Sequence, residues 1–182
     1  MTGCPDTGAP SHPPKTAGYS RVTMSHMMLP QDANPAGIVH GGVVMKHIDD
    51  AAGVVALRHT RCNVVTASID RLDFHNPAFI GNLLSLKASL NLVGSTSMEV
   101  GVRVETEDLK TGEIRHTASA YLTFVALDDN FRPRPVPPMV LETDEDRRRH
   151  RQAEARRRVR LAEKTRETSC RTDPATCLPH QE

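Results

Sequence analysis

The chain has 182 residues, a mass of 20.0 kDa and a formal net charge of +1. This length fits one domain of about 120 to 140 residues with tails, or a very compact pair of domains. No stretch approaches the roughly 20 apolar residues of a membrane span, and the N-terminus lacks the basic and apolar regions of a signal peptide. We therefore expect a cytoplasmic protein without a membrane span.

The charges are distributed unevenly. Residues 1–141 carry 12 Lys and Arg against 13 Asp and Glu, whereas residues 142–182 carry 11 against 9. A near-neutral body lacks the basic face that neutralises phosphates, so we expect no nucleic-acid partner for the folded domain. The four cysteines, at positions 4, 62, 170 and 177, show no Cys-x-x-Cys spacing. They therefore indicate neither a disulfide framework nor a zinc site. No Gly-x-Gly-x-x-Gly or Walker A motif is present in the sequence either, so we expect no metal and no cofactor.

The N-terminal part contains one candidate strand. Residues 1–17 hold four prolines among Gly, Ser and Thr, a composition that predicts a disordered segment. Apolar and polar residues then alternate from Val22 to Met28, which predicts a strand. A loop with Pro35 and Gly37 follows, from Pro30 to Val39.

The run from Gly42 to His59 predicts a helix. Val44, Ile48, Ala52 and Val55 recur at helical spacing, and the run is too long and too apolar for a half-exposed strand. A helix that is apolar on most sides is enclosed by other elements.

Four sets of alternating apolar residues follow this helix and predict four strands. They comprise Val65, Ala67 and Ile69; Leu84, Leu86, Ala88, Leu90 and Leu92; Met98, Val100, Val102 and Val104; and Ala118, Ala120, Leu122, Phe124 and Ala126. Short connections, such as the one at residues 110–112, favour antiparallel pairing. The predicted α+β domain, residues 18–140, is therefore a hotdog fold, in which an antiparallel five- to six-stranded sheet wraps round a long central helix.

A second helix is predicted after the domain. The proline-rich segment from Phe131 to Pro138 ends the domain, and Thr143 with Asp146 has the form of a capping box. Acidic residues precede basic ones, in agreement with the helix dipole. We expect a basic C-terminal helix within residues 141–167, with residues 144–167 helical, and a disordered tail at residues 168–182.

Two adjacent carboxylates lie in the middle of the central helix. Asp50 has Lys46 four residues earlier and can form an ordinary surface pair. Asp49 has no cation within reach on its own helix, and an ionised carboxylate on an apolar face is costly unless another group meets it. Asp49 either bonds to a neighbouring strand or a partner subunit, or acts as a general base beside a water molecule.

The entrance to the same helix carries Asn34, His40, Gly41 and Gly42. Free N–H groups at a helix N-terminus can stabilise an oxyanion, and glycines let a ligand approach the backbone. The ordinary alternatives, a tight turn into the helix for the glycines and a turn before proline for Asn34, stay open. His40 and His47 have no clustered third ligand, so they do not indicate a metal site.

Several blocks of the sequence, in the same order, resemble the hotdog acyl-CoA thioesterases of the cytosolic acyl-CoA hydrolase type. The resemblance covers about residues 20–160. The matching blocks are NPAGIVHGGVVMKHID at 34–49, Arg58-His59, VVTASID at 64–70, Phe74-His75, Gly81, GSTSME at 94–99 and Val136-Pro137.

The resemblance implies hydrolysis of a fatty acyl-CoA to the free acid and CoA. In the family pattern Asp49 activates water, Asn34 positions water or substrate, and the amide of Gly42 polarises the thioester carbonyl. Some family members divide these roles between two domains. This chain resembles the single-domain members, in which a homodimer forms two equivalent sites and three dimers commonly form a hexamer.

The resemblance also implies contacts with the substrate. His40 and Gly41 belong to the substrate site, and Arg156 of the C-terminal helix meets a phosphate of CoA. By the same resemblance, the pantetheine lies along Thr66, Ala67 and Ser68. The nucleotide end lies near Ser95, Thr96 and Ser97.

Two other functions compete with hydrolysis. A non-catalytic acyl-CoA or nucleotide sensor could use the same fold, but such a protein has no use for an unpaired carboxylate at Asp49. The basic helix at residues 147–166 could bind nucleic acid, but it has no aromatic residues for stacking.

Overall fold

The computed structural model describes residues 13–172. Its main sheet has five antiparallel strands in the order β2-β4-β5-β6-β3. The strands are β2 (Val22–Met27), β3 (Asn63–Phe74), β4 (Leu83–Val93), β5 (Ser97–Glu107) and β6 (Ile114–Leu127). A small parallel sheet pairs β1 (Lys15–Thr16) with β7 (Met139–Val140). The predicted hotdog architecture is confirmed.

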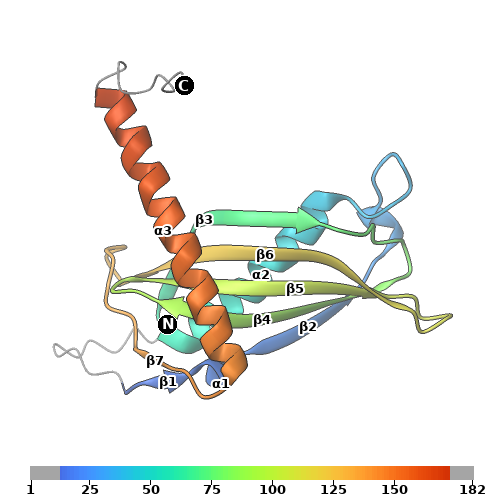
Figure 1. Cartoon of the computed structure of the whole chain (residues 1–182). Helices are drawn as coiled ribbons and strands as arrows, with labels where there is room; N and C mark the ends of the chain where they lie inside the picture. Colours follow the sequence, from blue (N-terminus) through green and yellow to red (C-terminus); the bar gives the residue numbers. More distant parts are fainter. Residues whose placement is uncertain (1–12, 173–182) are drawn as a thin grey trace.

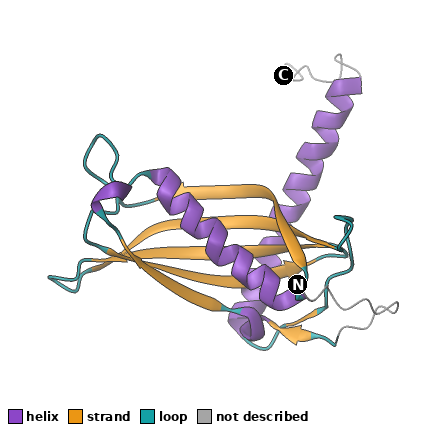
Figure 2. Cartoon of the chain, turned by 180° about the vertical axis from the view of Figure 1, so that it is seen from behind, coloured by secondary structure: helices purple, strands orange, loops and turns teal. Residues whose placement is uncertain are grey.

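Helix α2 (Gly41–Thr60) lies against one face of the main sheet (Figure 2). Small buried residues such as Ala51, Ala52 and Ala56 allow the helix to approach the strands closely. They pack on inward-facing residues that include Leu86 and Leu122. The predicted helix is confirmed, with one more residue at each end.

Helix α3 (Asp144–Thr172) crosses the opposite face of the sheet (Figure 1). It begins with the predicted capping box: the amide of Asp146 donates to Oγ1 of Thr143 at 3.1 Å, and the amide of Thr143 donates to Oδ2 of Asp146 at 3.1 Å. Because α3 covers this face, polar residues of the sheet such as Asn91 and Glu99 are buried. Glu99 lies between the core residues Met98 and Val100, so alternation along β5 points its side chain to this outer face, where α3 buries it.

Two predicted boundaries and the prediction about the cysteines are wrong. Residues 15–17 are ordered, because Lys15 and Thr16 form β1 and pair with β7, and Ala17 begins the short helix α1 (Ala17–Ser20). The domain therefore starts before residue 18. Helix α3 continues five residues past the predicted end at 167, into the segment predicted to be disordered. Cys62 is disulfide-bonded, although the cysteine spacing indicated no disulfide. The rest of the two segments predicted to be disordered, 1–12 and 173–182, lies outside the described residues.

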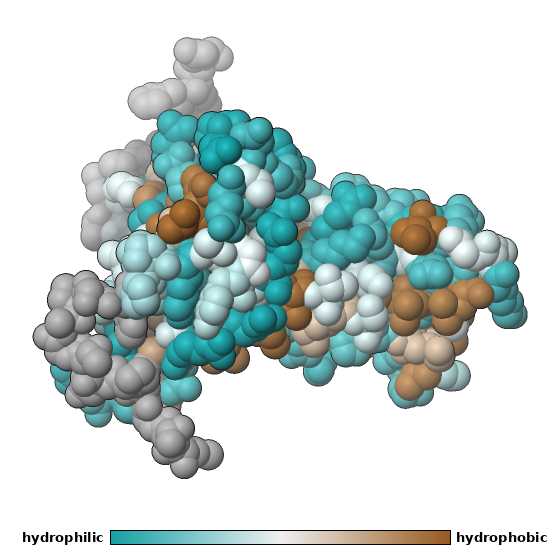
Figure 3. Space-filling model, turned by 90° about the horizontal axis from the view of Figure 1, so that it is seen from below, coloured by the Kyte–Doolittle hydropathy of each residue, from teal (hydrophilic) through white to brown (hydrophobic). Residues whose placement is uncertain are grey.

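One end of the body carries a concentration of exposed hydrophobic side chains (Figure 3). This end holds the loop from β2 to α2, which contains a short 3₁₀ helix, η1 (Pro30–Asp32), and the hairpin between β5 and β6. Exposed residues there are Leu29, Phe79, Leu109 and Ile114. Within residues 13–172, no helix combines the length and the apolar character that crossing a membrane requires.

Candidate active site

Asp49 lies in the middle of α2 and is half-buried. The hydroxyl of Thr66, on the neighbouring strand β3, donates a hydrogen bond of 2.6 Å to Oδ1 of Asp49. Lys46 pairs with Asp50 at 3.0 Å, as predicted, and no cation of the described residues pairs with Asp49. One carboxylate is therefore paired with a cation at the surface, whereas the other is oriented by a neutral donor.

The side chain of Asn34 is held by the backbone of its own loop. Its Oδ1 accepts hydrogen bonds from the amides of Ala36 at 2.9 Å and Ile38 at 3.3 Å. The turn predicted as the ordinary role of Asn34 is therefore present. The turn uses the oxygen of the side chain and fixes its plane, so the Nδ2 amide group is the part that can donate to a ligand.

A pocket of about 380 Å³ opens beside Asn34 at the start of α2. Most of its walls are apolar, and they include Ile38, Gly41, Val44, Phe74 and Ala78. Asp49 and Thr66 are not among the residues that line it. Gly42 and Asp49 are seven residues apart on α2, about 10 Å at 1.5 Å per residue.

His40 caps the N-terminus of α2. Its Nδ1 accepts a hydrogen bond of 2.9 Å from the amide of Gly42, the group predicted to polarise the thioester carbonyl. A side chain at position 42 would meet the His40 ring, because a Cβ there would lie 3.0 Å from Nδ1. The amide of Gly42 can bind a substrate only when the imidazole moves away, whereas that of Gly41 donates to no backbone acceptor in the described part of the chain.

Arg156 does not lie free for a phosphate. Its Nη2 is 2.6 Å from Oε1 of Glu99, which is 2% exposed, and its guanidinium lies 3.6 Å from the ring centre of Tyr121. These contacts anchor α3 to the sheet. The predicted phosphate contact at Arg156 is therefore not supported by the arrangement of this side chain.

Arg157, the next residue, lies at the predicted nucleotide loop instead. A Cβ at Gly94 would lie 3.1 Å from Nη2 of Arg157 and 3.2 Å from Oγ of Ser97. Arg157 makes no ion pair with the described residues, so its charge is available to a ligand. Because Arg156, Arg157 and Arg158 are consecutive, the sequence does not indicate which of them lies nearest the nucleotide loop. Only the positions of their guanidinium groups in the fold distinguish them.

The remaining predicted contacts lie at two places. Ser95 and Thr96 are in the connection between β4 and β5, where they accept backbone hydrogen bonds from Val136 and Ala126. Ala67 and Ser68 follow Thr66 on β3, and the Ser68 hydroxyl donates to Asp70 at 2.8 Å. On one chain, therefore, the predicted nucleotide loop and the Asn34 pocket lie at opposite ends of the sheet.

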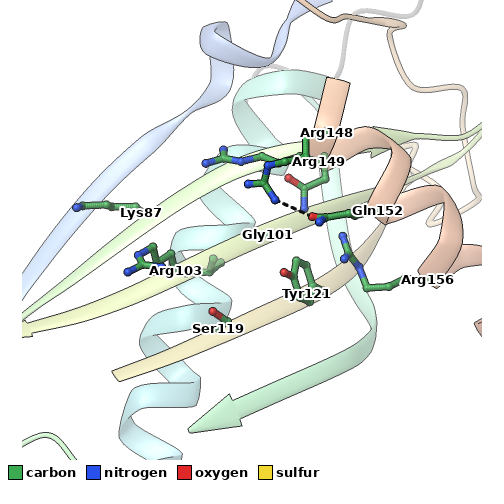
Figure 4. Close-up of a pocket in the computed structure, with 11 residues that line it drawn as sticks. Lys87, Gly101, Arg103, Ser119, Tyr121, Arg148, Arg149, Gln152 and Arg156 are labelled. Atoms are coloured by element: carbon green, nitrogen blue, oxygen red, sulfur yellow. Dashed lines mark hydrogen bonds between the residues drawn. The ribbon is translucent and has the colours of Figure 1, made fainter. Parts of the chain in front are cut away.

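A second pocket lies under α3, on the sheet face opposite Asp49 (Figure 4). Five cationic side chains line it, and each is paired with a carboxylate of Glu99, Glu105 or Glu145. They are Lys87, Arg103, Arg148, Arg149 and Arg156. The sheet separates this pocket from Asp49, so it does not belong to the candidate active site.

The comparisons identify the family. A model of the thioesterase superfamily matches residues 36–113. The uncharacterized acyl-CoA thioester hydrolase YkhA of Bacillus subtilis is 43% identical over 127 residues, which are 70% of this chain and 74% of the relative. The chain belongs to the thioesterase superfamily. A second superfamily member, the cytosolic acyl coenzyme A thioester hydrolase of Mus musculus, is 35% identical over 145 residues, 79% of this chain but 38% of the relative. The chain thus spans less than half of the mouse protein.

Solved thioesterases share the architecture. An acyl-CoA hydrolase from Staphylococcus aureus, in complex with butyryl coenzyme A, coenzyme A and coenzyme A disulfide, superposes with a TM-score of 0.81 at 33% identity. The match covers 90% of this chain and 99% of that chain. An apo-hexameric acyl-CoA thioesterase superposes with a TM-score of 0.79 at 39% identity, covering 81% of this chain and 95% of that chain.

Alanine variants of the Staphylococcus aureus protein have also been solved. They replace an asparagine, an aspartate and a threonine, which are separated by 15 and 17 positions. Asn34, Asp49 and Thr66 have the same two separations in this chain.

Proposed function

We propose that this protein hydrolyses acyl-CoA thioesters, fatty acyl-CoA among them, with Asp49 as the general base. The observation that carries the proposal is the Asp49 carboxylate, which is held by Thr66 and has no cationic partner among residues 13–172. The CoA ligands and the matching residue separations in the Staphylococcus aureus hydrolase support it.

In the proposed reaction Asp49 accepts a proton from a water molecule, whose oxygen attacks the thioester carbonyl carbon. The developing oxyanion accepts hydrogen bonds from Nδ2 of Asn34 and from the N-terminal amides of α2, at Gly41 and, once His40 rotates away, at Gly42. The C–S bond then breaks, and CoA leaves as a thiolate that takes up a proton. The apolar pocket beside Asn34 accommodates the acyl chain.

A second copy of the chain completes this site in our proposal. Strand β3 lies at an edge of the sheet, where its outer backbone groups pair with no other strand of the described residues. Exposed apolar residues flank this edge on α2 and β3, namely Met45, Leu57, Ile69 and Phe74. Within one chain, Asp49 does not line the pocket beside Asn34. A two-fold dimer through this edge would bring Asn34 of one subunit toward Asp49 of the other. Three such dimers would form a hexamer, in keeping with the hexameric thioesterase.

Arg157 is our replacement for Arg156 as the contact with a CoA phosphate. A guanidinium beside Gly94 and Ser97 can form two parallel hydrogen bonds to a phosphate. Thr66, Ala67 and Ser68 would then lie along the pantetheine.

The test is thiol release from short-, medium- and long-chain acyl-CoAs by the wild type, Asp49→Asn and Asp50→Asn. We expect turnover by the wild type, a loss of about 10²- to 10⁴-fold in Asp49→Asn, and little change in Asp50→Asn. Equal effects of the two substitutions would remove Asp49 from the mechanism. Binding of CoA without turnover of any acyl-CoA would instead indicate a sensor.

A further inference from the structure

Strand β3 contains two irregularities close to Asp49. Its register against β6 shifts between Thr66 and Ser68 and again between Ile69 and Arg71. In a regular strand, residues 66, 68 and 70 would all point to one face of the sheet. Here Thr66 reaches α2 on one face, whereas Asp70 reaches α3 on the other. The bulged segment therefore connects the two faces of the sheet through a few residues of backbone.

The carboxylate of Asp70 is held by three donors from three elements. It accepts hydrogen bonds from the hydroxyl of Ser68 on β3 at 2.8 Å, from the hydroxyl of Thr123 on β6 at 3.3 Å and from the guanidinium of Arg160 on α3. The side chain of Asp70 is 9% exposed and that of Arg160 is 24% exposed. A charge-assisted bond with this little exposure is stronger than a surface ion pair and fixes the geometry of both partners.

The position of β3 depends on such contacts because β3 is an edge strand. Among the strands of residues 13–172 it is paired with β6 alone, and that pairing is interrupted at both register shifts. Arg160 lies near the point where α3 leaves the sheet, since residues 161–169 are all exposed. The Arg160–Asp70 pair thus attaches the bulged segment of β3 to α3 four residues from Thr66.

We propose that Arg160 and Asp70 are positioning residues of the thioesterase site. Their ion pair holds the bulged segment of β3 so that the Thr66 hydroxyl stays within hydrogen-bond distance of Asp49. The inference rests on the proposed role of Asp49. It assigns to the C-terminal helix a part in orienting the base from the opposite face of the sheet.

A double-mutant cycle between Arg160 and Thr66 tests this coupling. Complete loss of one hydrogen bond to a charged group corresponds to roughly a tenfold change in a rate constant. Arg160→Gln would weaken the Thr66–Asp49 bond, so we expect it to lower kcat by about three- to tenfold with KM unchanged. In a Thr66→Val background the same substitution should cause no further loss, because the bond that it would weaken is already gone. Asp70→Asn, which keeps the size of the side chain, should reproduce the effect, and Arg160→Lys should restore part of it.

Arg158→Gln is the matched control. Arg158 lies on the same helix, is exposed and makes no ion pair with the described residues. Arg158→Gln should therefore leave kcat unchanged, both in the wild type and in the Thr66→Val background. Multiplicative losses of kcat in the double variant, or an Arg160→Gln protein with the wild-type kcat, would overturn the inference. If either result is found and the Asp49→Asn protein is inactive, the coupling through Arg160 is excluded but Asp49 stands as the proposed base. An active Asp49→Asn protein would remove Asp49 as the base, and with it the reason for positioning Thr66; an absence of turnover in the wild type would remove the proposed function itself.

Discussion

The hydroxyl of Thr66 donates a hydrogen bond of 2.6 Å to the carboxylate of Asp49, joining strand β3 to the middle of α2. A threonine hydroxyl is neutral, so it orients the carboxylate without supplying the positive charge that would hold it in an ion pair. The contact also satisfies one possibility that the sequence left open, a bond from Asp49 to a neighbouring strand. The structural and the catalytic interpretations of Asp49 are therefore compatible.

Substitution of Thr66 should impair turnover more than folding. Thr66→Val keeps the shape of the side chain and removes the donor, so we expect kcat to fall by roughly tenfold, the scale of one hydrogen bond to a charged group. Thr66→Ser keeps a hydroxyl and should retain most of the activity. Steady-state kinetics with one acyl-CoA, together with a thermal melt of each variant, would measure both effects. Equal activity of the Val and Ser variants would contradict the role of the hydroxyl.

A site shared between subunits should allow complementation. Asn34→Ala and Asp49→Asn proteins should each be slow, and a mixed dimer should regain activity because one of its two sites then contains both native residues. Differently tagged subunits can be unfolded together, refolded and purified by both tags. Verified mixed dimers that stay as slow as either parent would show that one chain supplies both residues.

Arg157 and Arg158 offer a matched test of the CoA contact. Arg157 lies beside Gly94 and Ser97, whereas Arg158 is exposed. Loss of a phosphate contact corresponds to about 1.5 to 3 kcal/mol, so Arg157→Gln should raise KM about tenfold or more with little change in kcat. Arg158→Gln should leave both constants unchanged. A similar rise in KM for the two variants would point to a diffuse charge effect, which high salt would reduce.

His59 should make the stability of the fold depend on pH. It is fully buried at the end of α2, where Nε2 donates to the carbonyl of Pro137 at 2.8 Å. Burial lowers the pKa of His59 below its ordinary value of 6.5. The unfolded chain therefore binds a proton first as the pH falls, and stability present above about pH 6.5 is lost on acidification.

The midpoint of thermal unfolding, measured between about pH 7.5 and pH 5.5, should fall with pH as this linkage requires. His59→Gln should be less stable than the wild type near pH 7.5 but should show a shallower dependence. Some dependence should remain, because burial and the neighbouring His26 also lower the pKa of His47. An unchanged slope in His59→Gln would exclude His59 as a source.

The sequence determined the elements that local spacing controls. Helix α2 follows from apolar residues at helical spacing, the strands follow from alternation, and the start of α3 follows from the capping pair of Thr143 and Asp146. The pairing of Lys46 with Asp50 is equally local, because residues four apart on a helix are neighbours.

The tertiary structure decided the features that depend on contacts between distant segments. The burial of Glu99 under α3, its pairing with Arg156, and the pairing of Lys15 and Thr16 with β7 all involve partners more than 50 residues away. The bulges that turn Thr66 toward α2 and Asp70 toward α3 likewise arise from the register against β6, which no periodicity within β3 reveals. Spacing along the chain specifies which residues share a face of one element, but the residues that meet across elements are set by packing.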